Sequence, residues 1–85
     1  MAYYAAFLNM IDAKKNIEVR PRHIKYLNEL DQKGKVFARG PFADGTGGLV
    51  VYIADTFEEA LSLAEKDPHV AEKSRRLELK EWQVL

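Results

Sequence analysis

The stretch "GLVVYIADTFEEALSLAEKDP", residues 48–68, joins an apolar run to an amphipathic segment that carries capping signals. Its opening residues are apolar and include β-branched side chains and a tyrosine, which predicts a strand over 48–54. Asp55 or Thr56 can then cap a helix, and a glutamate three residues further on completes a capping box. Because the residue before a proline disfavours helical backbone, Pro68 ends this helix. The stretch therefore predicts a buried strand followed closely by a helix.

A second helix and three further strands are predicted outside this stretch. An apolar stripe at helical spacing predicts a helix from about Pro21 to Lys33, and Gly34 can take the positive φ that closes a helix. The last segment changes the phase of its apolar alternation between Leu79 and Trp82, which predicts a bulge or a change of packing surface. The further strands are expected at residues 2–9, 35–40 and 75–85, and a loop is expected at 10–19.

The order strand, helix, strand, strand, helix, strand is the split βαβ pattern of the ferredoxin-like α+β fold. The handedness of parallel crossovers places both helices on one face of a four-stranded antiparallel sheet. The opposite face then stays bare, and a second copy of the chain is the expected cover, which predicts a homodimer. Its candidate lining residues are Tyr3 or Tyr4, Val50 or Val51, and Trp82. The 85 residues are expected to form a single domain, 1–85.

Composition narrows the class of protein. Thirteen basic and thirteen acidic side chains cancel, which argues against an electrostatic nucleic-acid binder. There are no cysteines, so disulfides and thiolate metal sites are excluded. The apolar N-terminal run lacks the basic region and cleavage site of a signal peptide, and no run approaches the ~20 apolar residues of a membrane span. A cytoplasmic protein that binds neither membranes nor nucleic acid is expected.

His23 is the first candidate for chemistry, because an imidazole lies beside the apolar stripe in the first turn of the predicted helix. Asp44 lies in "PFADGTGG", a turn-rich stretch that predicts a hairpin between the second and third strands. The topology brings that hairpin to the end of the sheet where the helix begins. A carboxylate on one imidazole nitrogen would fix the tautomer and make the other nitrogen a general base. The alternative is that His23 is a surface residue and Asp44 a turn residue.

Other polar features carry weaker predictions. Gly45, Gly47 and Gly48 could cradle an anion, but no phosphate-loop lysine follows them and a hairpin turn explains them. Arg20 and Arg22 could hold an acidic substrate group or could be solvated loop residues. A metal site is poorly supported, because His23, His69 and Asp44 are too few and too dispersed to form a ligand set. No cofactor is predicted.

The chain resembles the YciI-like family, also called the YCII-related domain family, over nearly its whole length. The matching elements are Arg20 three residues before His23, Gly34 closing the helix, Gly40-Pro41-Phe42 followed by Asp44, and Asp67-Pro68 after the second helix. Each element alone is weak, but their order and spacing together are fairly specific. After the Asp-Pro step the family commonly has an aromatic residue, whereas this chain has His69, which is expected to be solvated.

The resemblance implies a ferredoxin-like dimer of the dimeric α/β-barrel kind. It also implies an active site in which His23 and Asp44 form a catalytic pair, with Arg20, Gly40, Pro41 and Phe42 contacting a substrate. One branch of the family removes chloride from a hydroxylated aromatic ring during the breakdown of chlorinated aromatics.

Three functions are compatible with these observations. The first is a small enzyme that uses a His–Asp acid–base pair, without a cofactor, for lyase or isomerase chemistry on a small molecule such as an aromatic compound. The second is a non-catalytic dimeric module that binds a small metabolite in the same pocket. The third is a purely structural dimeric domain.

Overall fold

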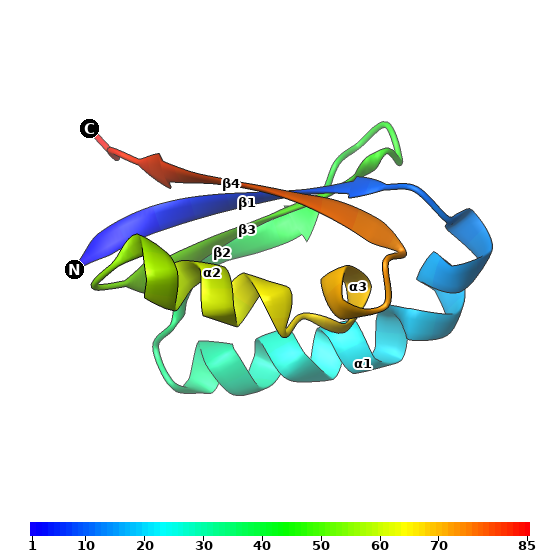
Figure 1. Cartoon of the computed structure of the whole chain (residues 1–85), viewed down its shortest axis with the longest axis horizontal. Helices are drawn as coiled ribbons and strands as arrows, with labels where there is room; N and C mark the ends of the chain where they lie inside the picture. The colour runs from blue at the N-terminus through cyan, green and yellow to red at the C-terminus, as the bar shows by residue number, and fades with distance from the viewer.

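The computed structural model covers residues 1–85 and contains one four-stranded sheet with helices on one of its faces. In chain order the elements are β1 (Ala2–Met10), α1 (Ala13–Gln32), β2 (Val36–Pro41), β3 (Gly47–Ala54), α2 (Phe57–Glu65), α3 (Pro68–Ala71) and β4 (Arg75–Trp82). The strands run antiparallel in the order β2-β3-β1-β4, and Figure 1 shows all three helices below this sheet. The predicted ferredoxin-like fold is confirmed.

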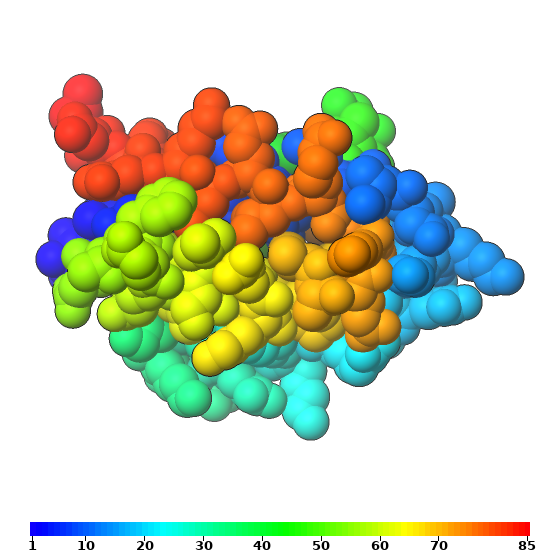
Figure 2. Space-filling model, in the orientation of Figure 1, coloured from blue at the N-terminus to red at the C-terminus, as the bar shows by residue number.

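The core lies between the sheet and the helices. Side chains alternate between the faces of a strand, so every second residue of β1 and of β3 points toward the helices. The strand residues buried in this way are Tyr4, Ala6, Leu8, Val50, Tyr52 and Ala54, and the helices contribute Val19, Leu27, Leu30, Ala60 and Ala64. Figure 2 shows the yellow and orange surface of α2 and α3 between the cyan of α1 and the orange-red of β4. None of the helices combines the length and apolar character needed to cross a membrane.

Helix α1 begins eight residues earlier than its predicted start at Pro21, so the predicted loop at 10–19 is wrong. Asp12 caps the helix by accepting a hydrogen bond from the backbone N–H of Lys15 at 3.0 Å. Pro21 therefore lies inside α1, where it cannot donate to the carbonyl of Ile17. Both residues are exposed, so water can bond that carbonyl. His23 consequently lies near the middle of α1 instead of in its first turn.

The predicted cap of α2 and the predicted glycine after α1 are confirmed, but the capping box of α2 is only half formed, because the Glu59 carboxylate lies 3.6 Å from Nζ of Lys35 instead. Thr56 caps α2, and its hydroxyl oxygen accepts from the N–H of Glu59 at 3.1 Å. Gly34 follows α1 with a φ of +72°.

Strand β4 pairs with β1 without interruption from Arg75 opposite Met10 to Trp82 opposite Tyr3. Of the two predicted alternatives, the bulge is absent and the change of packing surface is confirmed. Trp82 lies on the face away from the helices because an even number in β4 points opposite to Leu77 and Leu79. The one register shift of the sheet lies in β2, between Val36 and Ala38.

Gly47, at the start of β3, is required by its backbone. Its φ is +146°, and a Cβ at this position would lie 1.9 Å from the carbonyl oxygen of Leu8 on β1.

Gly47→Ala should therefore reduce the free energy of unfolding by about 2–4 kcal/mol in urea denaturation. Gly40→Ala is the matched control, because a Cβ on Gly40 meets nothing within 4 Å, and it should change stability by about 0.5 kcal/mol at most. Equal effects of the two substitutions would contradict this reading of the hairpin.

Candidate active site

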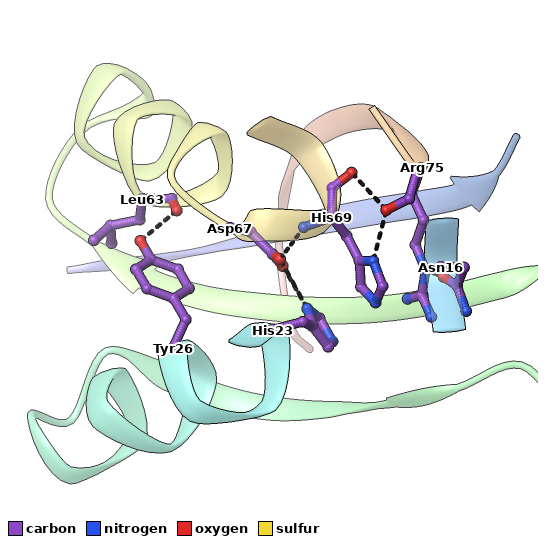
Figure 3. A network of polar contacts seen from close by, with 8 residues as sticks. Asn16, His23, Tyr26, Leu63, Asp67, His69 and Arg75 are labelled. Carbon is purple, nitrogen blue, oxygen red and sulfur yellow. Dashed lines mark hydrogen bonds and ion pairs between the residues drawn. The ribbon is translucent and has the colours of Figure 1, made fainter. Parts of the chain in front are cut away.

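His23 on α1 pairs with Asp67, the residue immediately before α3. The ring Nδ1 of His23 lies 2.8 Å from Oδ1 and 2.9 Å from Oδ2 of the Asp67 carboxylate (Figure 3). The Asp67 side chain is completely buried, whereas 12% of the His23 side chain is exposed. The carboxylate thus fixes the imidazole from the protein interior, and the ring's other nitrogen, Nε2, is left free.

Local structure holds Asp67 in this position. Asp67 is the N-cap of α3, and its Oδ1 accepts a hydrogen bond from the backbone N–H of His69 at 2.9 Å. Pro68 follows as the first helical residue, where its missing N–H costs nothing. A buried carboxylate is costly unless it is hydrogen-bonded, and here both oxygens have partners.

His69 is fully buried, so the prediction that it is solvated is wrong. Its ring lies against that of His23, with 4.3 Å between the ring centroids. Its Nδ1 lies 2.7 Å from the hydroxyl oxygen of Ser74, which itself donates to the His69 carbonyl at 3.2 Å. Because the hydroxyl has only one proton, Nδ1 is the donor to Ser74. The Nε2 of His69 is then a buried acceptor without a partner.

His69 remains neutral near neutral pH. Burial lowers the pKa of His69 to about 4, and the positive charges of Arg75 and Arg20 act in the same direction, while the carboxylate of Asp67 opposes them. The two neighbouring imidazoles therefore have different environments, since His23 has a carboxylate partner and His69 has a hydroxyl.

A cleft of about 280 Å³ lies between α1 and the sheet, and His23 forms part of its wall. We call "the cleft" the space lined by Arg20, His23, Ile24, Leu27, Arg39, Gly40, Pro41, Gly48, Leu49, Val50 and Arg75. Since Asp67 occupies Nδ1 of His23, Nε2 is the nitrogen available to a molecule in the cleft.

The lining of the cleft is strongly basic. It contains three arginines and a histidine but no aspartate or glutamate. Arg75 donates through Nε to the side-chain oxygen of Asn16 at 2.7 Å, and burial lowers its pKa. Arg39 lies 4.0 Å from Asp31, at the limit of an ion pair.

The predicted hydrogen bond between His23 and Asp44 is not formed, because His23 bonds Asp67 instead. Asp44 is exposed and caps its own turn, accepting from the N–H of Thr46 at 3.0 Å and from its hydroxyl at 2.7 Å. These hydrogen bonds lower the pKa of Asp44. In Figure 1 the β2–β3 connection that carries Asp44 projects from the sheet on the side away from α1. A catalytic role for Asp44 stays a prediction without a contact to His23.

The predicted substrate-contacting residues divide into two groups. Arg20, Gly40 and Pro41 line the cleft. Phe42 is outside that lining, and its N–H donates to the Gly47 carbonyl at the base of the hairpin. Arg22 is also outside it and forms an ion pair with Glu72.

Sequence reasoning missed Asp67 as the partner of His23, although the signal was present. The Asp-Pro step was recognised both as the stop of a helix and as an element of the family pattern. An acidic residue directly before Pro at a helix start is a strong N-cap, and such a cap is hydrogen-bonded and tolerates burial. His69 and Arg75 had no comparable local signal.

No group of three or more His, Cys, Asp or Glu residues is arranged to hold a metal ion. The site is therefore defined by one imidazole–carboxylate pair and by the arginines around it.

Fold and site together define a ferredoxin-like α+β domain with a buried His–Asp pair beside a basic cleft. The family model of the YCII-related domain matches residues 2–83, and the chain belongs to this family, as the sequence motifs had predicted. The chain is 38% identical over 82 residues to Uncharacterized protein YjpA of Bacillus subtilis (strain 168), and the match covers 96% of each protein.

A solved structure with the same fold is 5-chloro-2-hydroxyhydroquinone dehydrochlorinase (TftG) from Burkholderia phenoliruptrix AC1100, in complex with 2,5-dihydroxybenzoquinone. The two structures superpose with a TM-score of 0.80 over 95% of this chain and 93% of that one, at 20% sequence identity. At this identity the likeness establishes the shared fold.

The low pKa of His69 predicts an acid-sensitive protein. The unfolded chain binds a proton to His69 near the ordinary pKa of 6.5, and the folded chain only near 4. Stability from this residue is therefore complete above pH 6.5 and is lost as the pH falls from 6.5 to 4, by on the order of 3 kcal/mol. Urea denaturation at a series of pH values between 7.5 and 4 measures the free energy of unfolding. This free energy should fall less on acidification for His69→Gln than for the unchanged protein. The other titrating groups are common to both proteins, so parallel curves would contradict the prediction.

Proposed function

We propose that the chain is a small acid–base enzyme of the lyase type, in which His23 transfers a proton to or from a small molecule in the cleft. The observation that carries the proposal is the pairing of Nδ1 of His23 with the buried carboxylate of Asp67, at 2.8 and 2.9 Å. This pairing differs from the His23–Asp44 pair expected from sequence, and Asp67 takes the role of the orienting carboxylate.

The geometry suits a general base. Asp67 accepts the Nδ1 proton of neutral His23, which leaves the lone pair on Nε2 for the substrate. When Nε2 takes a proton, the carboxylate stabilises the resulting imidazolium, and the same proton can be returned at a later step. The neighbouring ring of His69 is neutral, so no second positive charge opposes this step. A positioned acid–base group of this kind contributes ~10²–10⁴-fold to a rate.

The comparisons favour an elimination on a ring-shaped substrate. The name of the structural neighbour describes the loss of chloride from a hydroxylated aromatic, and its ligand is a dihydroxylated quinone. Elimination of hydrogen chloride requires removal of one proton and departure of chloride, which a base and a binding site can supply. A cleft of about 280 Å³ has the size for one small molecule, near the lower end for ligand pockets at about 300 Å³.

We further propose that a second copy of the chain covers the helix-free face of the sheet. That face carries Trp82 and Phe37, which are 44% and 50% exposed. The ring of Phe37 packs edge-on against Tyr3 with 4.8 Å between centroids, so the aromatic residues form a patch. Exposed apolar patches of this kind mark association surfaces.

The two candidate carboxylates can be separated by matched substitutions. Asp67→Asn should lower kcat by ~10²–10⁴-fold, comparably to His23→Ala, because the imidazole loses its fixed tautomer. Asp44→Asn should leave kcat within a few-fold of the unchanged protein. The measurement is chloride release from 5-chloro-2-hydroxyhydroquinone and a panel of hydroxylated aromatics. Ring ¹⁵N NMR of His23 should show a protonated Nδ1 in the unchanged protein and in Asp44→Asn, and a tautomer mixture in Asp67→Asn.

The contrary results are equally specific. If Asp44→Asn reduces turnover as much as Asp67→Asn, the hairpin carboxylate is the catalytic one. If members of the panel bind and His23→Ala weakens them while no product ever forms, the chain is a binding module.

Introducing negative charge into the aromatic patch tests the proposed dimer. Trp82→Glu combined with Phe37→Glu should shift the molecular mass in solution from that of two chains to that of one, as measured by light scattering after size exclusion. Ile17→Glu is the control, because Ile17 is 74% exposed on α1 at the opposite side of the molecule. A mass of two chains in the double variant would exclude this face as the interface.

A further inference from the structure

Two of the three arginines that line the cleft have no carboxylate partner. Arg22 forms an ion pair with Glu72, and Arg39 lies 4.0 Å from Asp31. Arg20 and Arg75 form no ion pair, although both line the cleft. Leaving a partly buried guanidinium without a counter-charge is unfavourable unless a ligand supplies one.

The residues around Arg75 fix the position of its side chain. It starts β4, and its side chain reaches across to β3, where a Cβ on Gly48 would lie 3.1 Å from Nη1 of the guanidinium. The same Cβ would lie 2.9 Å from the Gly40 carbonyl oxygen, so the glycine leaves room both for the backbone of β2 and for the guanidinium. The Arg75 side chain makes one hydrogen bond, from Nε to the side-chain oxygen of Asn16 (Figure 3). Asn16 is itself buried. This bond holds the arm of the side chain and leaves both terminal nitrogens for another partner.

Arg20 lies on the same face of α1 as His23, because residues three apart on a helix are neighbours. The cleft thus has two unpaired guanidinium groups on the same lining as Nε2 of His23. The carboxylate of Asp67 does not neutralise them by contact, since it is hydrogen-bonded to His23 and to the N–H of His69.

We propose that the cleft selects a small anionic substrate, whose carboxylate or phosphate group is held by Arg75 and Arg20 while the reacting carbon lies beside His23. The planar fork of a guanidinium matches two oxygens of such a group and gives charge-assisted hydrogen bonds. The proposal that Arg75 and Arg20 bind an anion does not depend on the proposed acid–base function. Only the placement of a reacting carbon beside His23 rests on that function.

The test compares two probes of the same shape and different charge, benzoate and benzamide, by NMR titration of the full chain. Benzoate should bind at least ~10-fold more tightly, because charged hydrogen bonds are worth more than neutral ones. Its affinity should also fall as salt is raised, while that of benzamide stays constant. Phenyl phosphate is the third probe, and whichever anion binds more tightly identifies the preferred group.

Substitutions of individual arginines identify which of them bind the benzoate carboxylate. Arg75→Gln should weaken benzoate binding by ~10–100-fold and leave benzamide unchanged. Arg20→Gln is the second variant, since Arg20 is exposed and its loss spares the fold. Arg22→Gln is the matched control, because Arg22 lies outside the cleft, and it should leave benzoate binding unchanged.

Equal affinity for benzoate and benzamide, including no binding of either, would overturn the inference. So would benzoate binding that survives in both Arg75→Gln and Arg20→Gln. The proposed catalytic function fails in a different way. A chain that prefers benzoate to benzamide but turns over neither an anionic compound nor any member of the panel of hydroxylated aromatics retains its anion site and loses its assignment as an enzyme.

Discussion

The buried carboxylate of Asp67 is the group on which the site depends. An ionised acid inside a protein is tolerated only with a full set of partners. Asp67 obtains them from the His23 ring, at 2.8 and 2.9 Å, and from the N–H of His69, at 2.9 Å. The same bonds attach α3 to the middle of α1 and turn Nε2 of His23 toward the cleft. The interaction that makes the burial possible thus also orients the base.

The two neighbouring histidines, with 4.3 Å between ring centroids, are held in different environments by this arrangement. His69 is buried and bonded to a hydroxyl, so desolvation keeps it neutral near neutral pH. His23 is partly exposed, and its Nδ1 is bonded to a carboxylate. The two rings therefore differ in burial and in hydrogen-bond partner although they lie side by side.

The fold could be predicted because its signals are local. The apolar runs of β1 and β3, the cap at Thr56 and the positive φ at Gly34 all depend on neighbours in the chain. The same reasoning was wrong where a local rule had an exception. A proline normally marks a helix start, but Pro21 is exposed and α1 begins before it, at the cap supplied by Asp12. The change of phase in β4 left a bulge and a change of packing surface open, and the structure shows the second, with Trp82 on the other face of the strand.

The sequence by itself determined the order of the strands and the two main helices, the family, and the grouping of His23 with Arg20, Gly40 and Pro41, which line one cleft. Only the tertiary structure decided which acid serves His23, because Asp44 satisfies its own turn through Thr46 whereas Asp67 is carried by α3 against α1. It likewise decided that His69 is buried and that Arg75 reaches the cleft past Gly48. The reason is physical: hydrogen-bond partners and burial are set by packing between segments far apart in the chain, and such packing leaves no mark on local sequence periodicity.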